Sequence, residues 1–491
     1  MQRLAILLAG IIVTSGLAGC FANPEPVPEP EPGPFDFGMP LPITTFYHFA
    51  NYGDAEANHS VNGTSVLTGN NTPFFAEGTY YATGFSTFEP TLGVTSSGYL
   101  FMTSWGSGIA GATAMVRCFD LPGLAAMPGG TLEYVCEDVY DPTLPITNSN
   151  DPYLYVDPWT DRLVKFDMHA LLGMTYEYSD NNGESWELVA IPVSGGYTPQ
   201  DHQTIASVPV PDNFPHPVFH ETIYVFCINT GAQGPIGSQC DSSFDGGITW
   251  EGQVMGHPLS LQCHGLSGHL VGANDGAIYR GNPSCDGPAA YRSLDGGRTW
   301  TEHTITTVTG SAGHEVAVTT DEASNLHAFW IGDDDLPYYS NSRDRGDTWR
   351  EPMMVAPPGI NGTGFPTIAA GADGRVAFGY IGSNGSEAWH GFMGVITDAW
   401  GEAPLITTVA VNLPDDVLDD TEDCGYRRCG GFGDFIDIVI DVDGRPWIAL
   451  SHSPAGDIGL FGTLARGPSL RGELSDLAPL PLGGDSTLPS G

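Results

Sequence analysis

The stretch Ser293-Leu-Asp295-Gly-Gly297-Arg-Thr-Trp300 carries the pattern that decides the fold, Ser-x-Asp-x-Gly-x-x-Trp. Three further stretches repeat it, the last with asparagine in place of the aspartate: 243–250, 342–349 and 179–186. The copies follow one another at steps of roughly 50 residues, and a period of this length is typical of propellers and solenoids. Four copies of an eight-residue pattern predict a chain built from repeated units.

The chemistry of this pattern, called the Asp box below, predicts a hairpin turn. The Asp or Asn side chain can bond to its own backbone, the glycine can take positive φ, and the tryptophan can pack on the turn. We expect this structural role for four residues: Asn181, Asp245, Asp295 and Asp344. A role of these side chains in binding calcium or a ligand is the alternative.

The rest of the chain repeats a simpler unit, in which an apolar strand, a polar or glycine-containing turn and a second apolar strand follow one another. Seven stretches show it: 90–103, 151–167, 203–227, 269–280, 314–330, 365–380 and 435–451. Residues 42–88 carry further strand-forming sequence that could close or cap a ring. The chain shows no helical periodicity and contains 65 glycines and 39 prolines. These features predict an all-β propeller of seven four-stranded blades, and six or eight blades are the alternatives.

The two ends differ from this middle part. Arg3, an apolar run and the sequence Leu17-Ala-Gly-Cys20 resemble a bacterial lipoprotein signal over residues 1–20, which implies cleavage before Cys20 and lipid on its thiol. A plain signal peptide is the alternative. Residues 21–41 form a Pro/Glu-rich spacer, 42–470 the propeller and 471–491 a flexible tail. We therefore expect an exported protein held at the cell surface by its lipid alone, since the apolar run is too short to span a bilayer.

The charge of the chain limits the classes of partner that we expect it to bind. The net charge is -42, with 58 acidic and 16 basic residues, which argues against nucleic-acid binding and against easy attraction of anionic substrates. A saline habitat would account for this acidity without any function. We expect a monomer.

The cysteines predict disulfides, as is usual in an exported protein, and a zinc site is the weaker alternative. Eight cysteines besides Cys20 fall into near-neighbour pairs: Cys118 with Cys136, Cys227 with Cys240, Cys263 with Cys285, and Cys424 with Cys429.

The Asp boxes resemble the BNR/Asp-box, sialidase-like superfamily over most of residues 90–465. That resemblance implies a propeller. Sialidases of the superfamily bind a carboxylate with three arginines, the first in an Arg-Ile-Pro motif, and use a tyrosine–glutamate nucleophile with an aspartate acid/base. This chain has no Arg-Ile-Pro, and Arg298, Arg343 and Arg345 lie inside Asp boxes. The arginines left as candidate carboxylate binders are Arg117, Arg280, Arg375 and Arg445.

A candidate site follows from propeller geometry, because the first residues of the innermost strands converge near the axis on one face. Three histidines and two carboxylates stand at such positions: His202, His269, His314, Glu315 and Asp434. They could act as general acids and bases or as metal ligands. Alternatively they bond neighbouring blades and trapped water. The sequence requires no cofactor, but calcium or another divalent metal ion is an alternative. The acidic loop 415–423 is a second candidate site for such an ion.

Two classes of function remain. The first is a surface enzyme acting on extracellular glycans, a glycoside hydrolase-like protein or a polysaccharide lyase using the axial histidines. The second is a non-catalytic propeller that binds a glycan or a surface protein. Four tryptophans could stack on sugars or simply pack the fold: Trp105, Trp159, Trp330 and Trp389. Histidines gathered in one pocket beside Glu315 or Asp434 would favour the enzyme, and scattered histidines would favour binding.

Overall fold

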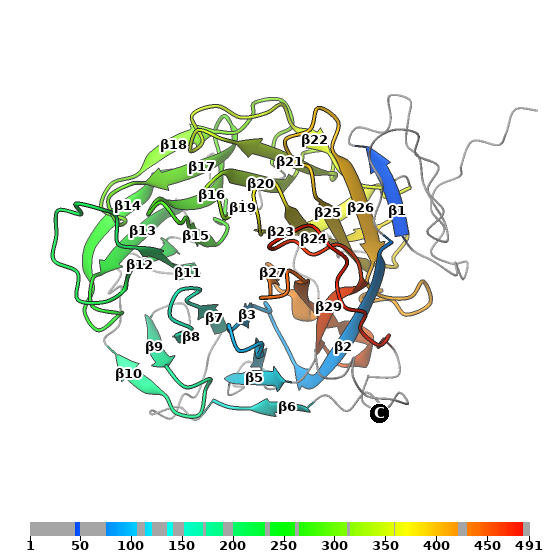
Figure 1. Cartoon of the computed structure of the whole chain (residues 1–491), viewed down its shortest axis with the longest axis horizontal. Helices are drawn as coiled ribbons and strands as arrows, with labels where there is room; N and C mark the ends of the chain where they lie inside the picture. Colours follow the sequence, from blue (N-terminus) through cyan, green and yellow to red (C-terminus); the bar gives the residue numbers. More distant parts are fainter. Residues whose placement is uncertain are drawn as a thin grey trace, which may run out of the picture. The chain divides into compact units, whose positions relative to one another are not determined.

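Seven antiparallel sheets form a ring around a central axis in the computed structural model (Figure 1). The structure describes residues 45–49, 75–105, 113–119, 135–140, 152–169, 173–189, 200–230, 236–260, 265–311, 315–357, 359–420 and 430–484. Each sheet is one blade, numbered 1 to 7 along the chain from the sheet that begins at β3. The predicted all-β propeller with seven four-stranded blades is thereby confirmed.

The blades of the first half follow the chain from the innermost strand outward. Blade 1 consists of β3 (Leu92–Val94), β4 (Leu100–Trp105), β5 (Thr113–Phe119) and β6 (Val135–Asp138). Blade 2 consists of β7 (Pro152–Val156), β8 (Leu163–His169), β9 (Gly173–Ser179) and β10 (Glu187–Val189). Blade 3 consists of β11 (Gln200–Pro209), β12 (Thr222–Thr230), β13 (Ile236–Ser243) and β14 (Glu251–Ser260).

The next two blades keep this order. Blade 4 consists of β15 (Leu270–Gly272), β16 (Ile278–Ser284), β17 (Gly287–Ser293) and β18 (Thr301–Thr304). Blade 5 consists of β19 (Val316–Thr320), β20 (Leu326–Ile331), β21 (Pro337–Ser342) and β22 (Met353–Met354).

Strands from the N-terminal part complete the last two blades. Blade 6 consists of β23 (Gly362–Ala370), β24 (Val376–Ser383), β25 (His390–Ile396) and β26 (Leu405–Ala410), with β1 (Thr45–Phe49) added outside. Blade 7 consists of β27 (Asp437–Ile440), β28 (Pro446–His452) and β29 (Ile458–Arg466). Its outer strand is β2 (Glu77–Ser86), which pairs antiparallel with β29. The ring is thus closed by a pairing between the two ends of the propeller. Two 3₁₀ turns lie in the described part of this blade, η2 (Gly430–Phe432) before β27 and η3 (Ser453–Ala455) after β28.

Apolar side chains fill the space between neighbouring blades. Seven buried clusters exist in the described residues, and each joins two adjacent blades. Strand β12, for example, is buried along its whole length because its two faces pack against blades 2 and 4. This sandwiching explains why the middle strands are apolar on both faces, as in other fully covered sheets.

The four Asp boxes are the turns between the third and fourth strands of blades 2 to 5. In blade 3, Asp245 Oδ1 accepts from Thr249 N at 2.9 Å, and Gly247, with φ of 89°, donates from N to Ser243 Oγ at 2.8 Å. Trp250 Nε1 donates to the carbonyl of Gly247 at 2.9 Å. The glycine is required here because a Cβ would lie 2.2 Å from the Tyr176 hydroxyl. The boxes have the turn geometry that the sequence predicts.

Two predicted disulfides are present, Cys118–Cys136 between β5 and β6 and Cys227–Cys240 between β12 and β13. Cys285 is disulfide-bonded as well. The other predicted cysteines, Cys20, Cys263, Cys424 and Cys429, lie outside the described residues.

The C-terminal segment differs from the loose tail expected over 471–491. Up to Gly484 it is placed against the propeller, with Leu477 and Leu480 buried and Gly484 N bonded to the carbonyl of Tyr80 at 2.8 Å. Its leucines cover apolar surface of blade 7, which the composition of the segment does not reveal. Among the described residues no helix has the length and apolarity needed to cross a membrane.

Candidate functional site

Near the start of three innermost strands the backbone adopts an unusual conformation. Glu89, His202 and Phe365 have φ of 49°, 50° and 57°, in the left-handed region that non-glycine residues rarely occupy. The pairing register shifts between Asp201 and Thr204, and between Gly364 and Thr367. Such bulges redirect side chains. Strain held at equivalent places in three blades marks this end of the axis as a candidate site.

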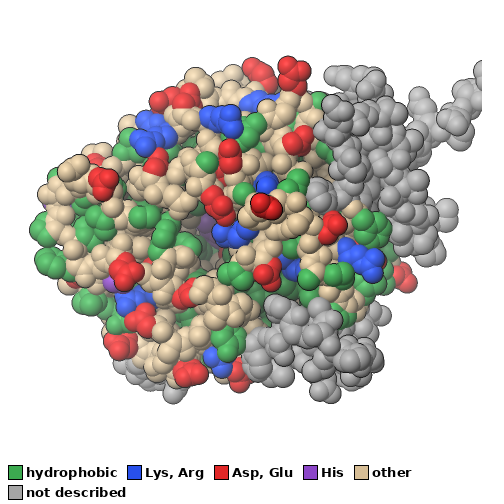
Figure 2. Space-filling view, in the orientation of Figure 1, with side chains coloured by type: hydrophobic (Ala, Val, Ile, Leu, Met, Phe, Trp, Pro, Cys, Tyr) green, Lys and Arg blue, Asp and Glu red, His purple; other side chains and the backbone are tan. Residues whose placement is uncertain are grey.

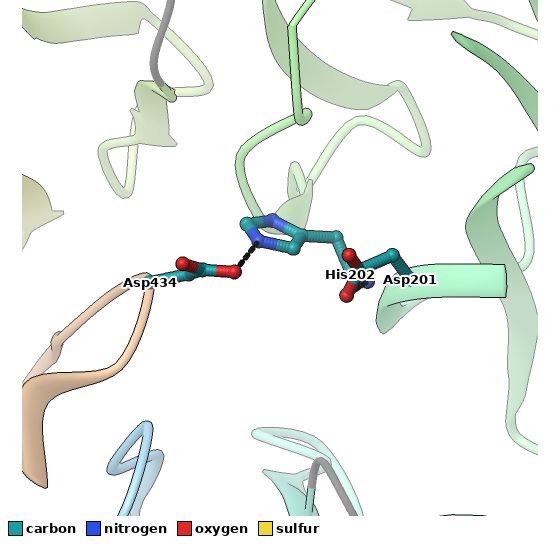
Figure 3. A group of neighbouring side chains, drawn as sticks. All are labelled: Asp201, His202 and Asp434. Atoms are coloured by element: carbon teal, nitrogen blue, oxygen red, sulfur yellow. Dashed lines mark hydrogen bonds and ion pairs between the residues drawn. The ribbon is translucent and has the colours of Figure 1, made fainter. Parts of the chain in front are cut away.

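The bulge in blade 3 brings the His202 imidazole to two carboxylates from other blades. His202 Nδ1 lies 3.1 Å from Glu315 Oε1, and Nε2 lies 3.6 Å from Asp434 Oδ2. Figure 3 shows the imidazole reaching from the start of β11 toward Asp434, with Asp201 beside it. Asp201, His202, Glu315 and Asp434, called the axial cluster below, are all less than a tenth exposed. They come from blades 3, 5 and 7, so the cluster joins the ring across its axis.

The carboxylates of the axial cluster set the charge of its imidazole. Burial alone would lower the pKa of His202, but Asp434 and Glu315 outweigh burial and hold that pKa well above the ordinary 6.5. Both contacts are ion pairs by distance, whereas a hydrogen bond with suitable angles joins Nδ1 to the carbonyl of Ser267 at 3.1 Å. His202 is therefore a buried cationic link between blades in this arrangement.

Arg280 holds the backbone next to the axial cluster through hydrogen bonds. Its side chain donates to the carbonyls of Gly268 and His202, both at 2.9 Å, and to Ser238 Oγ at 2.7 Å. Burial lowers the pKa of Arg280 to about 9, and the charge of Glu315 opposes this shift. An arginine left as a candidate carboxylate binder in the sequence thus has its donors committed to the protein.

An axial cavity of about 560 Å³ runs along the innermost strands, and Figure 2 shows a hollow near the middle of the view. Tyr153, His269, Glu315 and Asp437 line one end of the cavity. The other end is the mouth of the cavity, on the face that carries the Asp boxes. The mouth is formed by Trp159, Arg471 and four exposed turn residues, Ser96, Asn274, Glu322 and Val442.

His269 lies inside this cavity, apart from His202. Its Nδ1 is 3.9 Å from Asp437 Oδ1, its ring meets the rings of Tyr153 and Phe435 edge-on, and its side chain is 21% exposed. The pKa of Tyr153 is raised by burial and by the charge of Asp437. The structure thus brings His202, Glu315 and Asp434 together, separates His269 from them by Phe435, and leaves His314 outside the described residues. A catalytic role for these residues stays a prediction.

The candidate arginines do not assemble a carboxylate clamp in the axial cavity. Arg117 pairs with Glu137, while Arg375 and Arg445 donate to backbone carbonyls. Among the described arginines only Arg471 lines the cavity, and its Nη1 lies 3.2 Å from Glu322 Oε1.

Of the four tryptophans considered for sugar stacking, Trp330 and Trp389 are buried in the fold. The side chain of Trp105 lies outside the described residues. Trp159 is half-buried and lines both the axial cavity and a second hollow of about 720 Å³. The residues of this side groove are Trp159, Thr160, Arg162, Asp180 and 218–221. Phe219 in its wall is 82% exposed.

The described part of the acidic loop 415–423 forms hydrogen bonds with blade 7 and with the residue before β25 in blade 6. Asp416 accepts from the Tyr80 hydroxyl and from His452 Nε2, the latter at 2.8 Å. Asp419 is buried, and its carbonyl accepts from Trp389 N. These contacts connect the loop to its neighbours in the fold.

Sequence reasoning did not single out Tyr153, Arg471 or Phe219. Tyr153 could have been found as an aromatic residue near the start of a predicted innermost strand, in the stretch 151–167. Arg471 and Phe219 carry no such signal, because one lies in an expected tail and the other in the long turn between β11 and β12.

Comparisons with known proteins give distant similarity. No family model matches the chain, and no curated protein matches it. A protein of unknown function from Dyadobacter fermentans is 13% identical, over 79% of this chain and 97% of that one, with a TM-score of 0.43. The NanB sialidase from Streptococcus pneumoniae (a K499G mutant) is 10% identical, over 86% and 94%, with a TM-score of 0.42. The fucose-specific lectin from Aleuria aurantia is 9% identical, over 66% and 97%, with a TM-score of 0.42.

Proposed function

We propose that this protein is an exported propeller, anchored by lipid on Cys20, that binds extracellular glycans at the mouth of the axial cavity. The observation that carries the proposal is the position of Trp159, whose half-buried indole lines both the axial cavity and the side groove. An indole between two hollows offers a flat apolar surface of the kind on which sugar rings stack. Phe219 would supply a second such surface.

The charge of this region favours neutral sugars. Asp161, Glu322 and Asp437 line the axial cavity, and Asp180 and Glu221 line the side groove. Arg162 in the groove is held by Asp180 through two contacts of 2.7 and 2.8 Å, so its charge is already compensated. Because acidic walls repel anions, sialosides and uronates should bind less well than neutral oligosaccharides.

The export signal and lipid anchor rest on the sequence 1–20 and on the spacer after Cys20. The two disulfides agree with an oxidising compartment. Mass spectrometry of the N-terminal peptide from cell membranes tests this part: a diacylglyceryl group on Cys20 is expected, and Cys20→Ser should release the protein into the soluble fraction.

The binding proposal is tested by titrating the protein with neutral, sialylated and uronate-containing oligosaccharides. We expect Trp159→Ala to weaken the binding of neutral oligosaccharides about tenfold, the loss of one aromatic contact. Phe75→Ala is the matched control, since Phe75 is 42% exposed and lines neither hollow. Equal affinity of Trp159→Ala and wild type for every sugar that binds would disprove the proposed site.

A second candidate function, acid–base catalysis on a glycan that reaches from the mouth to the inner end of the axial cavity, is favoured by one observation. His269 faces the cavity with Asp437 Oδ1 3.9 Å from its Nδ1, and such a pair can accept and return a proton. If the wild type cleaves a glycan that it binds, His269→Gln should abolish turnover and preserve binding. If the wild type binds glycans and cleaves none of them, only the binding function remains.

A further inference from the structure

The axial cluster has the donor atoms of a metal site. Asp201, His202 and Asp434 each offer one ligand atom, and these atoms lie within 4.8 Å of one another. Two ligands at about 2.1 Å from a tetrahedral metal ion are roughly 3.4 Å apart. The 3.6 Å between His202 Nε2 and Asp434 Oδ2 is close to this spacing and too long for a hydrogen bond.

The nitrogen that would bind the ion has no hydrogen-bond partner in the described part of the chain. His202 Nε2 is buried and points at Asp434, as Figure 3 shows. The opposite nitrogen, Nδ1, lies 3.1 Å from the carbonyl of Ser267. Since Nδ1 donates to a carbonyl, the proton on Nε2 is the one that a metal ion would displace, and a second nitrogen held by a carbonyl is the usual second-shell arrangement of metal-binding histidines.

Two further carboxylates are buried beside these ligands, those of Glu89 and Glu315. Glu89 is in contact with the ligand Asp434, because its Oε1 accepts from Asp434 N at 3.2 Å. Carboxylates gathered in a buried site favour a bound cation, because burying negative charge is costly.

We infer that the axial cluster binds one divalent transition-metal ion through His202 Nε2 and the carboxylates of Asp201 and Asp434. An imidazole among carboxylates suits Zn²⁺ or Mn²⁺ better than Ca²⁺, which takes oxygen ligands. The left-handed backbone at His202 is then the cost of directing the imidazole to the axis. The site adjoins the end of the axial cavity opposite the mouth, since Glu315 lines that cavity and contacts His202. It is independent of the glycan site at the mouth.

The inference is tested on the full chain, stripped with a chelator and titrated separately with Zn²⁺, Mn²⁺ and Ca²⁺. We expect one Zn²⁺ or Mn²⁺ per chain by elemental analysis after dialysis, with a rise in melting temperature, and no such binding of Ca²⁺. His202→Gln and Asp434→Asn should lose the ion. His303→Gln is the matched control, an imidazole 3.4 Å from a single carboxylate, Asp347, and it should keep the ion.

A measurement without variants covers the case in which these substitutions prevent folding. Co²⁺ added to the stripped wild type should give visible absorption bands that saturate at one equivalent and vanish when Zn²⁺ displaces it. Stoichiometric metal that survives in folded His202→Gln would overturn the assignment. So would the absence of Co²⁺ bands together with an unchanged melting temperature in millimolar Zn²⁺ and Mn²⁺.

Discussion

The axial cluster and the Asp boxes hold the propeller together in opposite ways. An Asp box is local: Asp295 bonds with Ser293, Arg298 and Thr299, all within four residues. The axial cluster is non-local, because His202 and Asp434 come from blades 3 and 7 and are more than 200 residues apart in the chain. The boxes stand at the rim and partly face water, whereas the cluster is buried.

This difference separates two kinds of stability. Local turns at the rim can form before the ring closes, since they need only their own hairpin. The axial cluster can form only when blades 3, 5 and 7 are in place, and its charges are then removed from water. Buried ion pairs contribute little net stability when formed and cost much when one partner is removed. We therefore expect larger effects from single substitutions at the axis than at the rim.

The largest effect is expected for Arg280→Met. The change removes donors from the carbonyls of Gly268 and His202 and leaves Glu315 with less compensating charge. We expect the free energy of unfolding to fall by about 3–5 kcal/mol, the cost of breaking a buried charge network. Denaturant titration followed by tryptophan fluorescence measures it.

The control for Arg280→Met is the same change at the rim, Arg298→Met. Arg298 pairs with Glu251 and its side chain is 32% exposed, so a loss of at most about 1 kcal/mol is expected. Similar losses in both variants would contradict the contrast between axis and rim.

An intermediate effect is expected for Asp295→Ala. The carboxylate accepts from the backbone and hydroxyl of Thr299 at 2.8 and 2.7 Å, and these donors would have to turn to water. We expect a loss of about 1–3 kcal/mol by denaturant titration. Asp212→Ala, an exposed aspartate in the turn after β11, should leave the unfolding midpoint unchanged. A loss as large as that of Arg280→Met would mean that the boxes, too, depend on distant parts of the ring.

The same contrast explains what the sequence could predict. The Asp boxes lie within eight consecutive residues, so the pattern alone contains their turn, their glycine and the repeat that implies a propeller. The convergence of His202, Glu315 and Asp434 followed from propeller geometry. Whether His269 would join them did not, because the direction of each side chain depends on bulges such as the one between Asp201 and Thr204. A one-residue shift in register reverses the face to which a side chain points.

Other parts of the site depended on contacts that no local pattern contains. Trp159 and Trp330 are equally plausible stacking residues in the sequence, yet one lines two hollows and the other is fully buried. The difference arises because Trp159 lies in the turn between β7 and β8, whereas Trp330 lies within β20 and packs between blades. Burial of this kind is decided by the neighbouring blade.

The smallest effect separates one box from the other three by its response to acid. Burial would raise the pKa values of Asp245, Asp295 and Asp344, but hydrogen bonds, first from Thr249, Thr299 and Thr348, hold them below 3.8. Carboxylates with lowered pKa stabilise the fold above their unfolded pKa, and this stability is lost as pH falls through the folded pKa. Asn181 occupies the same position in blade 2, and its amide side chain does not titrate.

Changing the three aspartates to asparagine should therefore flatten the fall in melting temperature below about pH 4, and Asn181→Asp should steepen this fall. Identical acid curves for all three proteins would show that acid unfolding is governed elsewhere, with the buried carboxylates at the axis as the next groups to test.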